Sequence, residues 1–240
     1  MVFDVYDFTN SGGREHNEDS VGFTLWENGG IFVVADGLGG HSLGEVASAC
    51  VRDTLLSEWP PNDGLSVEWI KKRIKEANRR VLALQQERNT VMKSTVVVLV
   101  IVNGQALWAH VGDSRLYFIH NGRLVSVTED HSVAFKKYKA GEITREQLAF
   151  DEDQSRLLRT LGSEERNDPV VNVLQNRLIP GDAFFLCSDG AWEHLKDEEV
   201  AIDLLKSENS RQWSELLRLR MMDRISSGND NLTLLNVIVK

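Results

Sequence analysis

Residues Ile31–Asp36 read IFVVAD, a continuous apolar run that ends in a carboxylate. Gly29-Gly30 before the run and Gly37 after it mark turns, so the segment predicts a strand. Other strand-like runs also carry an aspartate at or beside one end. They are the segments around Asp19, ALWAHVGD (Ala106–Asp113), AFFLCSD (Ala183–Asp189) and NDNLTLLNVIV (Asn229–Val239), the last with Asp230 in front.

Aspartates at several strand ends indicate a metal site. One carboxylate at a strand end is usually a turn residue, but several that face one another repel strongly unless a cation neutralises them. Oxygen ligands without His or Cys favour Mg²⁺, Mn²⁺ or Ca²⁺ over Zn²⁺. We expect Mg²⁺ or Mn²⁺, because a few carboxylates that leave water on the ion suit catalysis.

Length and charge limit the function classes. A chain of 240 residues fits one large domain over 1–240. Lys and Arg number 27 against 36 acidic residues, a net charge of -9 that disfavours nucleic acid and anionic membranes as partners. Charged residues before position 20 exclude a secretory signal, and no apolar run approaches about 18 residues, so we expect a cytoplasmic protein.

The hydrophobic period changes along the chain. Residues 2–9, 20–26 and 31–35 predict strands, and 43–59 and 66–88 predict two amphipathic helices separated by Pro60-Pro61. Residues 94–102 begin a predicted meander of about four antiparallel strands. Asn103-Gly104 and Asn121-Gly122 are its hairpin signals.

The second half of the chain repeats this pattern after an insertion. Residues 132–161 predict short helices around Gly141 and read as a lid or recognition element. Strands near 170–175, at 183–187 and at 231–239 enclose a helical stretch that reaches about residue 225. Two antiparallel sheets packed face to face with helices outside, an α+β fold, fit this order and would bring the aspartates to one edge.

Six motifs occur in a fixed order. They are Arg14–Asp19 (REHNED), Asp36–His41 (DGLGGH), Gly112–Arg115 (GDSR), Thr128–Ser132 (TEDHS), Ser188–Gly190 (SDG) and Asn229–Asn231 (NDN). In this combination the chain resembles the metal-dependent protein serine/threonine phosphatases (PPM, or type 2C), in particular the bacterial members. The resemblance implies a four-layer α-β-β-α sandwich with a binuclear metal centre, and a flap at about 132–161.

The resemblance also implies roles for individual residues. Asp36, Gly37 through its carbonyl, Asp189 and Asp230 would hold two ions, Glu18 and Asp19 would act largely through bound water, and Asp113 with Asp189 would hold a third, weaker ion. Arg14 would clamp the substrate phosphate, because a guanidinium gives a phosphoryl group two parallel hydrogen bonds. Taken singly, each of these residues would be interpreted as an ordinary turn, loop or surface residue.

The expected mechanism is direct attack on phosphorus by a water that the metal ions activate, with Asp36 and Arg14 as the catalytic residues. Cys50 and Cys187 lie in apolar segments and are interpreted as buried packing residues rather than nucleophiles. Leu38 stands where some relatives carry a general-acid His, so no general acid is assigned. For His41 and His131 a structural role is favoured.

We therefore expect a monomeric phosphatase of phosphoserine and phosphothreonine in proteins phosphorylated by a Ser/Thr kinase. Two other classes stay open at this point. One is a catalytically weak phosphoprotein-binding module on the same fold, which lost metal ligands would favour. The other is a phosphatase of small phosphate esters.

Overall fold

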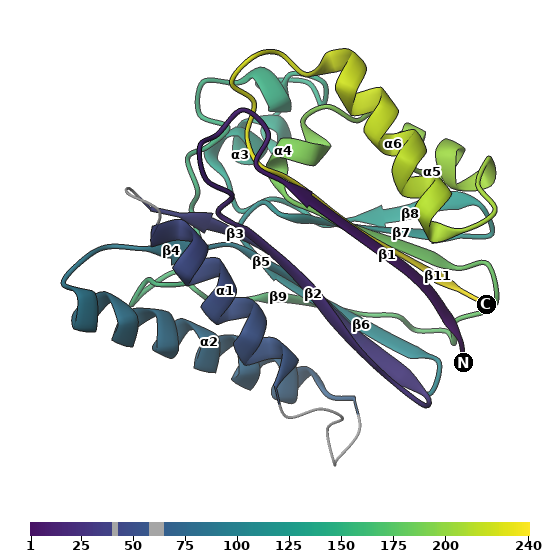
Figure 1. Ribbon diagram of the computed structural model, residues 1–240, viewed down its shortest axis with the longest axis horizontal. Coiled ribbons are helices and arrows are strands. Elements are labelled where there is room, and N and C mark those ends of the chain that lie inside the picture. Colours follow the sequence, from purple (N-terminus) through teal and green to yellow (C-terminus); the bar gives the residue numbers. More distant parts are fainter. Residues whose placement is uncertain (40–42, 58–64) are drawn as a thin grey trace.

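The computed structural model describes residues 1–39, 43–57 and 65–240. Two antiparallel sheets pack face to face, and helices cover both outer faces (Figure 1). One sheet has the strand order β1-β11-β10-β7-β8 and the other β2-β3-β5-β6-β9, with β4 paired to β3. This is the α-β-β-α sandwich of the α+β class that the sequence predicts.

The strands and helices have the following bounds. The strands are β1 (Phe3–Asn10), β2 (Asp19–Trp26), β3 (Gly29–Leu38), β4 (Lys93–Ser94), β5 (Val96–Val102), β6 (Gln105–Val111), β7 (Arg115–His120), β8 (Arg123–Val127), β9 (Val170–Val173), β10 (Ala183–Cys187) and β11 (Leu232–Val239). The helices are α1 (Leu43–Leu56), α2 (Val67–Arg88), α3 (Val133–Lys139), the 3₁₀ helix η1 (Leu148–Phe150), α4 (Asp189–Trp192), α5 (Asp197–Leu205) and α6 (Ser210–Arg224).

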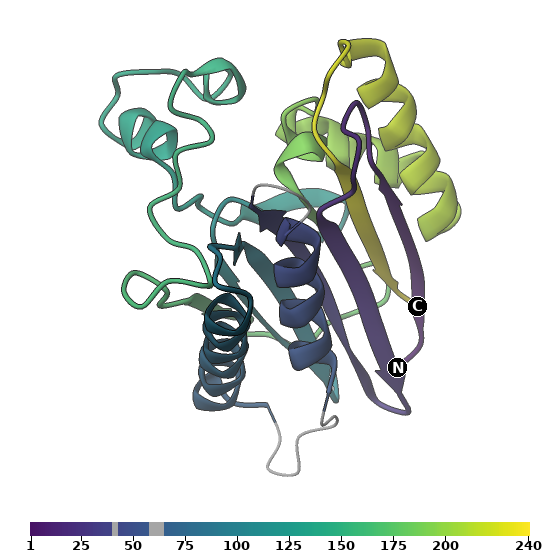
Figure 2. The same cartoon turned by 60° about the vertical axis from the view of Figure 1, so that its left-hand side comes forward.

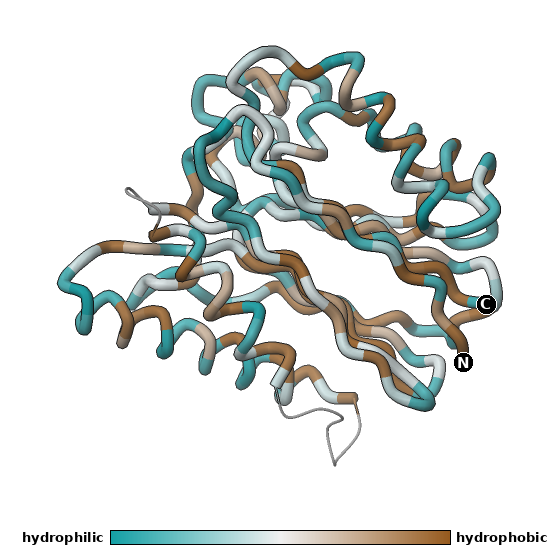
Figure 3. The backbone as a smooth tube through the Cα atoms, viewed as in Figure 1, coloured by the Kyte–Doolittle hydropathy of each residue, from teal (hydrophilic) through white to brown (hydrophobic). Residues whose placement is uncertain are grey.

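Strand β3 is apolar from Ile31 to Ala35 because both of its faces are covered there. Ile31 and Val33 pack against α1 and α2, whereas Phe32 and Val34 point into the layer between the sheets. Alternate side chains of a strand point to opposite faces, so a central strand under two layers needs apolar residues at every position. The helices are apolar on one face only, which Figure 3 shows as brown and teal alternating around them.

The helix bounds follow local capping. Helix α2 begins after Ser66, whose side chain accepts a hydrogen bond from the Trp69 N–H at 3.0 Å, and it ends at Asn89 with φ 48°. These bounds agree with the predicted 66–88. Helix α1 ends at Leu56, short of the predicted 59, and the predicted Pro60-Pro61 break lies outside the described residues.

The predicted four-stranded meander is wrong, although both of its hairpins are confirmed. Asn103-Gly104 and Asn121-Gly122 form turns with positive φ at both residues. Between them the chain leaves one sheet, where β5 pairs β6, and enters the other, where β7 pairs β8. Gly112 adopts φ +105° at this crossing, and a Cβ there would lie 2.7 Å from the Thr95 side chain. The crossing puts Asp113 at the end of the sandwich.

Within residues 132–161, helix α3 and η1 stand apart from both sheets (Figure 2), whereas Leu161 is bridged to Ser94 of β4. Helix α3 and η1 bury a small apolar cluster of their own around Phe135 and Leu148. The short helices predicted around Gly141 are therefore confirmed. Among the described residues, no helix has the length and apolar character needed to cross a membrane.

Candidate active site

A cavity of about 720 Å³ opens at the end of the sandwich where the predicted site residues converge. Its walls come from the β1–β2 loop, the end of β3, the β6–β7 crossing, the start of α4 and the segment before β11. They include Arg14, Glu18, Asp36, Gly37, Asp113, Asp189 and Asp230. Of the predicted site residues, only Asp19 does not line the cavity. We call it the acidic cavity below.

Asp19 lies behind this wall. It pairs with Asp36 across the β2–β3 ladder, its side chain is buried, and its Oδ2 accepts a hydrogen bond from Ser188 Oγ at 2.7 Å. Burial, with the charges of Asp189 and Asp230, raises the pKa of Asp19 to about 7. Asp19 can therefore act on the cavity through its charge, but not as an exposed ligand in this conformation.

The backbone around Asp36 is fixed from both sides. The Asp36 N–H donates to Thr95 Oγ1 at 3.0 Å, and the Thr95 N–H donates to the Asp36 carbonyl at 2.8 Å. Gly37 follows where a Cβ would lie 2.0 Å from the Gly44 carbonyl oxygen and 2.6 Å from that of Glu18. Only glycine fits at position 37, so Asp36 is held against the rim of the cavity.

The carboxylates raise one another's pKa. Burial, followed by the charges of neighbouring aspartates, raises the pKa of Asp36 and of Asp113 well above the ordinary value, and burial with Asp230 raises the pKa of Asp189 to about 6. Asp113 Oδ1 is buried and has no hydrogen-bond partner among the described residues. This unmet negative potential, with oxygen ligands only, fits a hard divalent cation.

The carboxylates are nonetheless held by separate partners. Arg14 Nη2 binds Asp230 Oδ2 at 2.8 Å, and the Gly190 N–H binds Asp189 Oδ1 at 2.7 Å. Within residues 1–39, 43–57 and 65–240, no three His, Cys, Asp or Glu side chains are already gathered as a metal-ligand group. Arg14 therefore supplies the positive charge beside Asp230 in this structure.

Sequence reasoning assigned no role to Asn231, although it belongs to a quoted motif. Its Nδ2 donates to the Ser11 and His16 carbonyls at 2.9 and 3.0 Å, and its Oδ1 accepts from the Glu18 N–H at 2.8 Å. These three bonds fix the loop that carries Arg14 against the start of β11. An Asn directly after Asp230 was the available signal.

Glu193 was also missed, because it follows the Asp189 motif without any pattern of its own. Burial and the charges of Asp189 and Asp230 raise the pKa of Glu193 to about 8. Gln154, from the segment 132–161, donates a hydrogen bond to Glu193 Oε1. Ser155 and Leu157 of that segment line the acidic cavity, so the insertion contacts the site on this side.

Neither His131 nor either cysteine lines the acidic cavity. His131 Nδ1 accepts a hydrogen bond from the Gly112 N–H at 3.1 Å, whereas His41 lies outside the described residues. Leu38 does line the cavity. Cys187 is buried as predicted, but Cys50 is only half-buried because the outer side of α1 is open there.

Without divalent cations, the free energy of unfolding of the protein should fall as pH rises from about 4 to 7. In that window the folded chain still holds protons on Asp36, Asp113, Asp189 and Asp19 that the unfolded chain has released, so the free energy of unfolding falls with pH. Mn²⁺ at about 100 times its Kd should restore about 2.7 kcal/mol at pH 7.5, or roughly 5–10 °C in Tm. The gain should be smaller at pH 5.

Thermal unfolding with chelator and with excess Mn²⁺, at both pH values, measures this. A metal-free protein that gains stability between pH 5 and 7 would contradict the mutual repulsion of the carboxylates.

Comparison with known proteins gives one consistent family. The family model "Protein phosphatase 2C" matches residues 11–218. The serine/threonine phosphatase stp of Listeria welshimeri serovar 6b is 34% identical over 233 residues, which cover 93% of this chain and 90% of that protein.

Solved structures give the same result. Serine/threonine phosphatase Stp1 from Staphylococcus aureus superposes with a TM-score of 0.88 at 28% identity, over 100% of this chain and 96% of that one. The catalytic domain of serine/threonine protein phosphatase PstP in complex with two manganese ions superposes with a TM-score of 0.83 at 26% identity, over 99% of both chains.

Proposed function

This chain belongs to the protein phosphatase 2C family and is a metal-dependent serine/threonine protein phosphatase, and we propose that the acidic cavity is its reaction centre. The observation that carries this proposal is the convergence of Asp36, Asp113, Asp189 and Asp230 on one cavity with Arg14 at its wall. The chain retains every predicted ligand, so nothing favours a catalytically weak binding module.

We assign two ions of Mg²⁺ or Mn²⁺ to Asp36, the Gly37 carbonyl, Asp189 and Asp230, and a third, weaker ion to Asp113 with Asp189. Two observations support this set: the raised pKa values of the buried aspartates, and the space at Gly37 that a side chain would fill. Glu18 and Asp19 stand close enough to add negative charge. When bound, such ions supply Lewis-acid charge and activate the water that attacks phosphorus.

The chain's own residues would bind and orient the phosphate. Arg14 has a side chain that is 57% exposed, and it faces Asp230 at the wall of the cavity. Once a cation neutralises Asp230, the guanidinium is free to bind two phosphoryl oxygens. The Thr95 and Asn231 hydrogen bonds keep Asp36 and the Arg14 loop in place, so the substrate meets a prearranged site.

We assign residues 132–161 as a flap inserted in a single phosphatase domain over 1–240. Ser155 and Leu157 contribute to the cavity, and Gln154 ties the segment to Glu193. Phosphoproteins are the substrates. We propose a Ser/Thr kinase as the enzyme that opposes this one, whereas a monomeric state and a cytoplasmic location stay predictions of the sequence.

Purified protein should release phosphate from a phosphothreonine peptide with Mn²⁺ and with Mg²⁺, and excess chelator should abolish the release. Colorimetric phosphate detection measures it. Parallel assays with 4-nitrophenyl phosphate separate a protein phosphatase from a phosphatase of small esters. Turnover that persists in chelator would contradict the assigned reaction centre.

Arg14→Ala should lower kcat/KM for the phosphopeptide by about 10–100-fold, or roughly 1.4–2.7 kcal/mol, which is about the net contribution of one hydrogen bond to a charged group. Arg14→Lys should restore only part of the loss, since a point charge cannot make two parallel bonds. Arg79→Ala is the matched control, because Arg79 is an exposed arginine that pairs with Glu76 on the same helix. Equal activity of Arg14→Ala and Arg79→Ala would show that Arg14 does not bind the substrate phosphate.

A further inference from the structure

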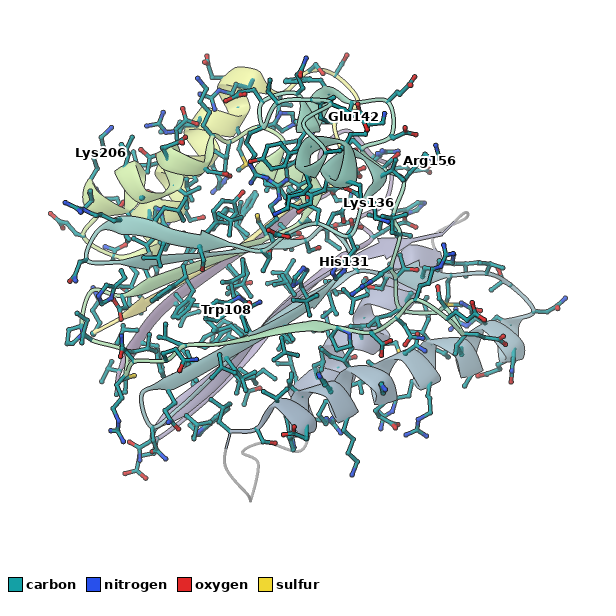
Figure 4. All side chains as sticks on the ribbon, turned by 180° about the vertical axis from the view of Figure 1, so that it is seen from behind. Trp108, His131, Lys136, Glu142, Arg156 and Lys206 are labelled. Carbon is teal, nitrogen blue, oxygen red and sulfur yellow. The ribbon has the colours of Figure 1, made fainter. Side chains whose placement is uncertain are left out.

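A second cavity, of about 540 Å³, opens on the side of the sandwich. It lies between β8 and β9, the edge strands of the two sheets, and helix α3 covers it. Figure 4 shows this side from behind, with Trp108, His131 and Lys136 along it. None of its lining residues lines the acidic cavity. We call it the lateral cavity.

The acidic side chains of the lateral cavity are already neutralised. Asp130 makes two hydrogen bonds to Arg115, at 2.8 and 2.7 Å, and both side chains are almost fully buried. Glu129 pairs with Lys139 at 2.7 Å. Neither carboxylate therefore needs a further cation from the cavity wall.

Two cationic side chains of the same wall remain. Among the described residues, Lys136 and Arg159 have no ion pair, and the one hydrogen bond that Arg159 donates there is to the Asp168 backbone carbonyl, at 3.2 Å. Two unpaired positive charges attract a dianion, and a guanidinium fits the geometry of phosphate oxygens. The lateral cavity thus has a net positive wall in a chain whose net charge is -9.

A stacked histidine pair adds hydrogen-bonding groups at the same cavity. The rings of His110 and His131 lie 4.6 Å apart at 13°. His110 Nε2 is 2.8 Å from the Glu129 carbonyl, so this nitrogen carries the proton and Nδ1 is an acceptor. His110 Nδ1 is buried and has no partner in the described part of the chain. Such a buried acceptor calls for a donor.

The rest of the wall is partly apolar and partly polar, with Ser126, Thr128 and Asn172 as its uncharged polar residues. Trp108 and Phe135, each 6% exposed, line the cavity together with Val127. Cavities of this size, with aromatic walls and a few polar groups, are typical of small-molecule sites.

We propose that the lateral cavity binds a small organic phosphate, with its phosphoryl group between Lys136 and Arg159 and its apolar or aromatic body along Trp108 and Phe135. Free inorganic phosphate shares the head group but lacks the body. Binding at this site would not require the metal ions, because no aspartate assigned to the ions contributes to it.

The lateral cavity and the acidic cavity share one connecting loop. The Gly112 N–H donates to His131 Nδ1 at 3.1 Å, and the His131 N–H donates to the Gly112 carbonyl at 2.9 Å. Asp113 is the next residue and lines the acidic cavity. A ligand against His131 should therefore be sensed at the Asp113 backbone.

Titration of ¹⁵N-labelled, Mg²⁺-loaded protein with phenylphosphonate tests the proposal, since its C–P bond resists hydrolysis. We expect saturable amide shifts at Trp108, His131, Gly112 and Asp113 with half-saturation below about 1 mM. These shifts should persist in chelator, whereas any shifts at Arg14 and Asp189 should disappear. Inorganic phosphate should bind the lateral cavity at least about 10-fold more weakly, because it leaves the aromatic wall uncovered.

Arg159→Ala and Lys136→Ala should each weaken the chelator-resistant binding by about 10-fold or more. Lys71→Ala, which removes an exposed charge from α2, is the matched control and should bind like the parent protein. Absence of saturable lateral shifts, or affinity equal in all three variants, would overturn the proposal. If inorganic phosphate bound as tightly as phenylphosphonate, the proposed contact of an organic body with Trp108 and Phe135 would be wrong.

Discussion

Asp36→Asn should lower phosphate release from a phosphothreonine peptide by about 10³-fold or more, equivalent to at least about 4 kcal/mol in the activation free energy. Asn keeps the size of the side chain but removes the negative charge that we assign to both ions. The fold should be retained, because the backbone of residue 36 is held by Thr95, whose two hydrogen bonds do not involve the carboxylate.

The same substitution should stabilise the protein when metal is absent. The folded-state pKa of Asp36 is raised by burial and by Asp189, Asp19, Asp113 and Asp230, so its ionisation costs stability as pH rises above about 4. An amide has no proton to lose. In chelator at pH 7.5, Asp36→Asn should therefore unfold at a higher temperature than the parent protein.

Both measurements, turnover and metal-free unfolding, need a control for the loss of one negative charge. Asp223→Asn removes an exposed carboxylate from α6 and should change neither turnover nor metal-free stability. Near-normal turnover of Asp36→Asn with Mn²⁺ would sink the assignment of the reaction centre. A lower metal-free unfolding temperature would instead mean that Asp36 is held by a favourable contact rather than by repulsion.

Arg115→Met should reduce the free energy of unfolding by about 3–5 kcal/mol, the largest stability effect that we expect. It leaves Asp130 buried and without its partner, because these side chains are only 3% and 2% exposed. It also removes the guanidinium that stacks 3.4 Å above the Trp192 ring. Trp192 Nε1 in turn donates to the Asp113 carbonyl at 2.9 Å, so the site should loosen as well.

Urea unfolding of three variants would measure the pair. Arg115→Met with Asp130→Leu should recover most of the loss, since an apolar replacement removes the uncompensated charge. Arg211→Met is the matched control, because the Arg211–Glu215 pair is exposed and should contribute less than about 1 kcal/mol. A loss below about 1 kcal/mol for Arg115→Met would show that water reaches Asp130.

Much of this fold is readable in the sequence because its signals are local. The apolar IFVVAD run, the Ser66 cap and the Asn-Gly turns each depend on residues within a few positions of one another. Their bounds agree with the structure to within a few residues. The meander prediction was wrong because its outcome is not set locally. A hairpin within one sheet and a crossing between two sheets both join consecutive strands of similar sequence, and Gly112 alone does not distinguish the two.

The candidate site was predicted as a set of residues, but not as an arrangement. Arg14 and Asp230 are named in separate motifs, and their 2.8 Å ion pair joins positions far apart in the chain. Glu193 carries no motif, and its pKa of about 8 arises from its burial and from the charges of Asp189 and Asp230, all of which depend on folding. Asp19 and Asp36 look alike in sequence, yet one is behind the wall and the other on it.

The sequence by itself determined the order of strands and helices, the family and the identity of the acidic residues, because periodicity, turn chemistry and motif order are properties of neighbouring residues. Only the tertiary structure decided which carboxylates share a cavity and which basic side chains neutralise them. It also decided that the basic side chains of Lys136 and Arg159 have no ion pair among the described residues. These outcomes depend on distances between segments that the chain brings together only on folding, and electrostatic energy depends on those distances and on burial.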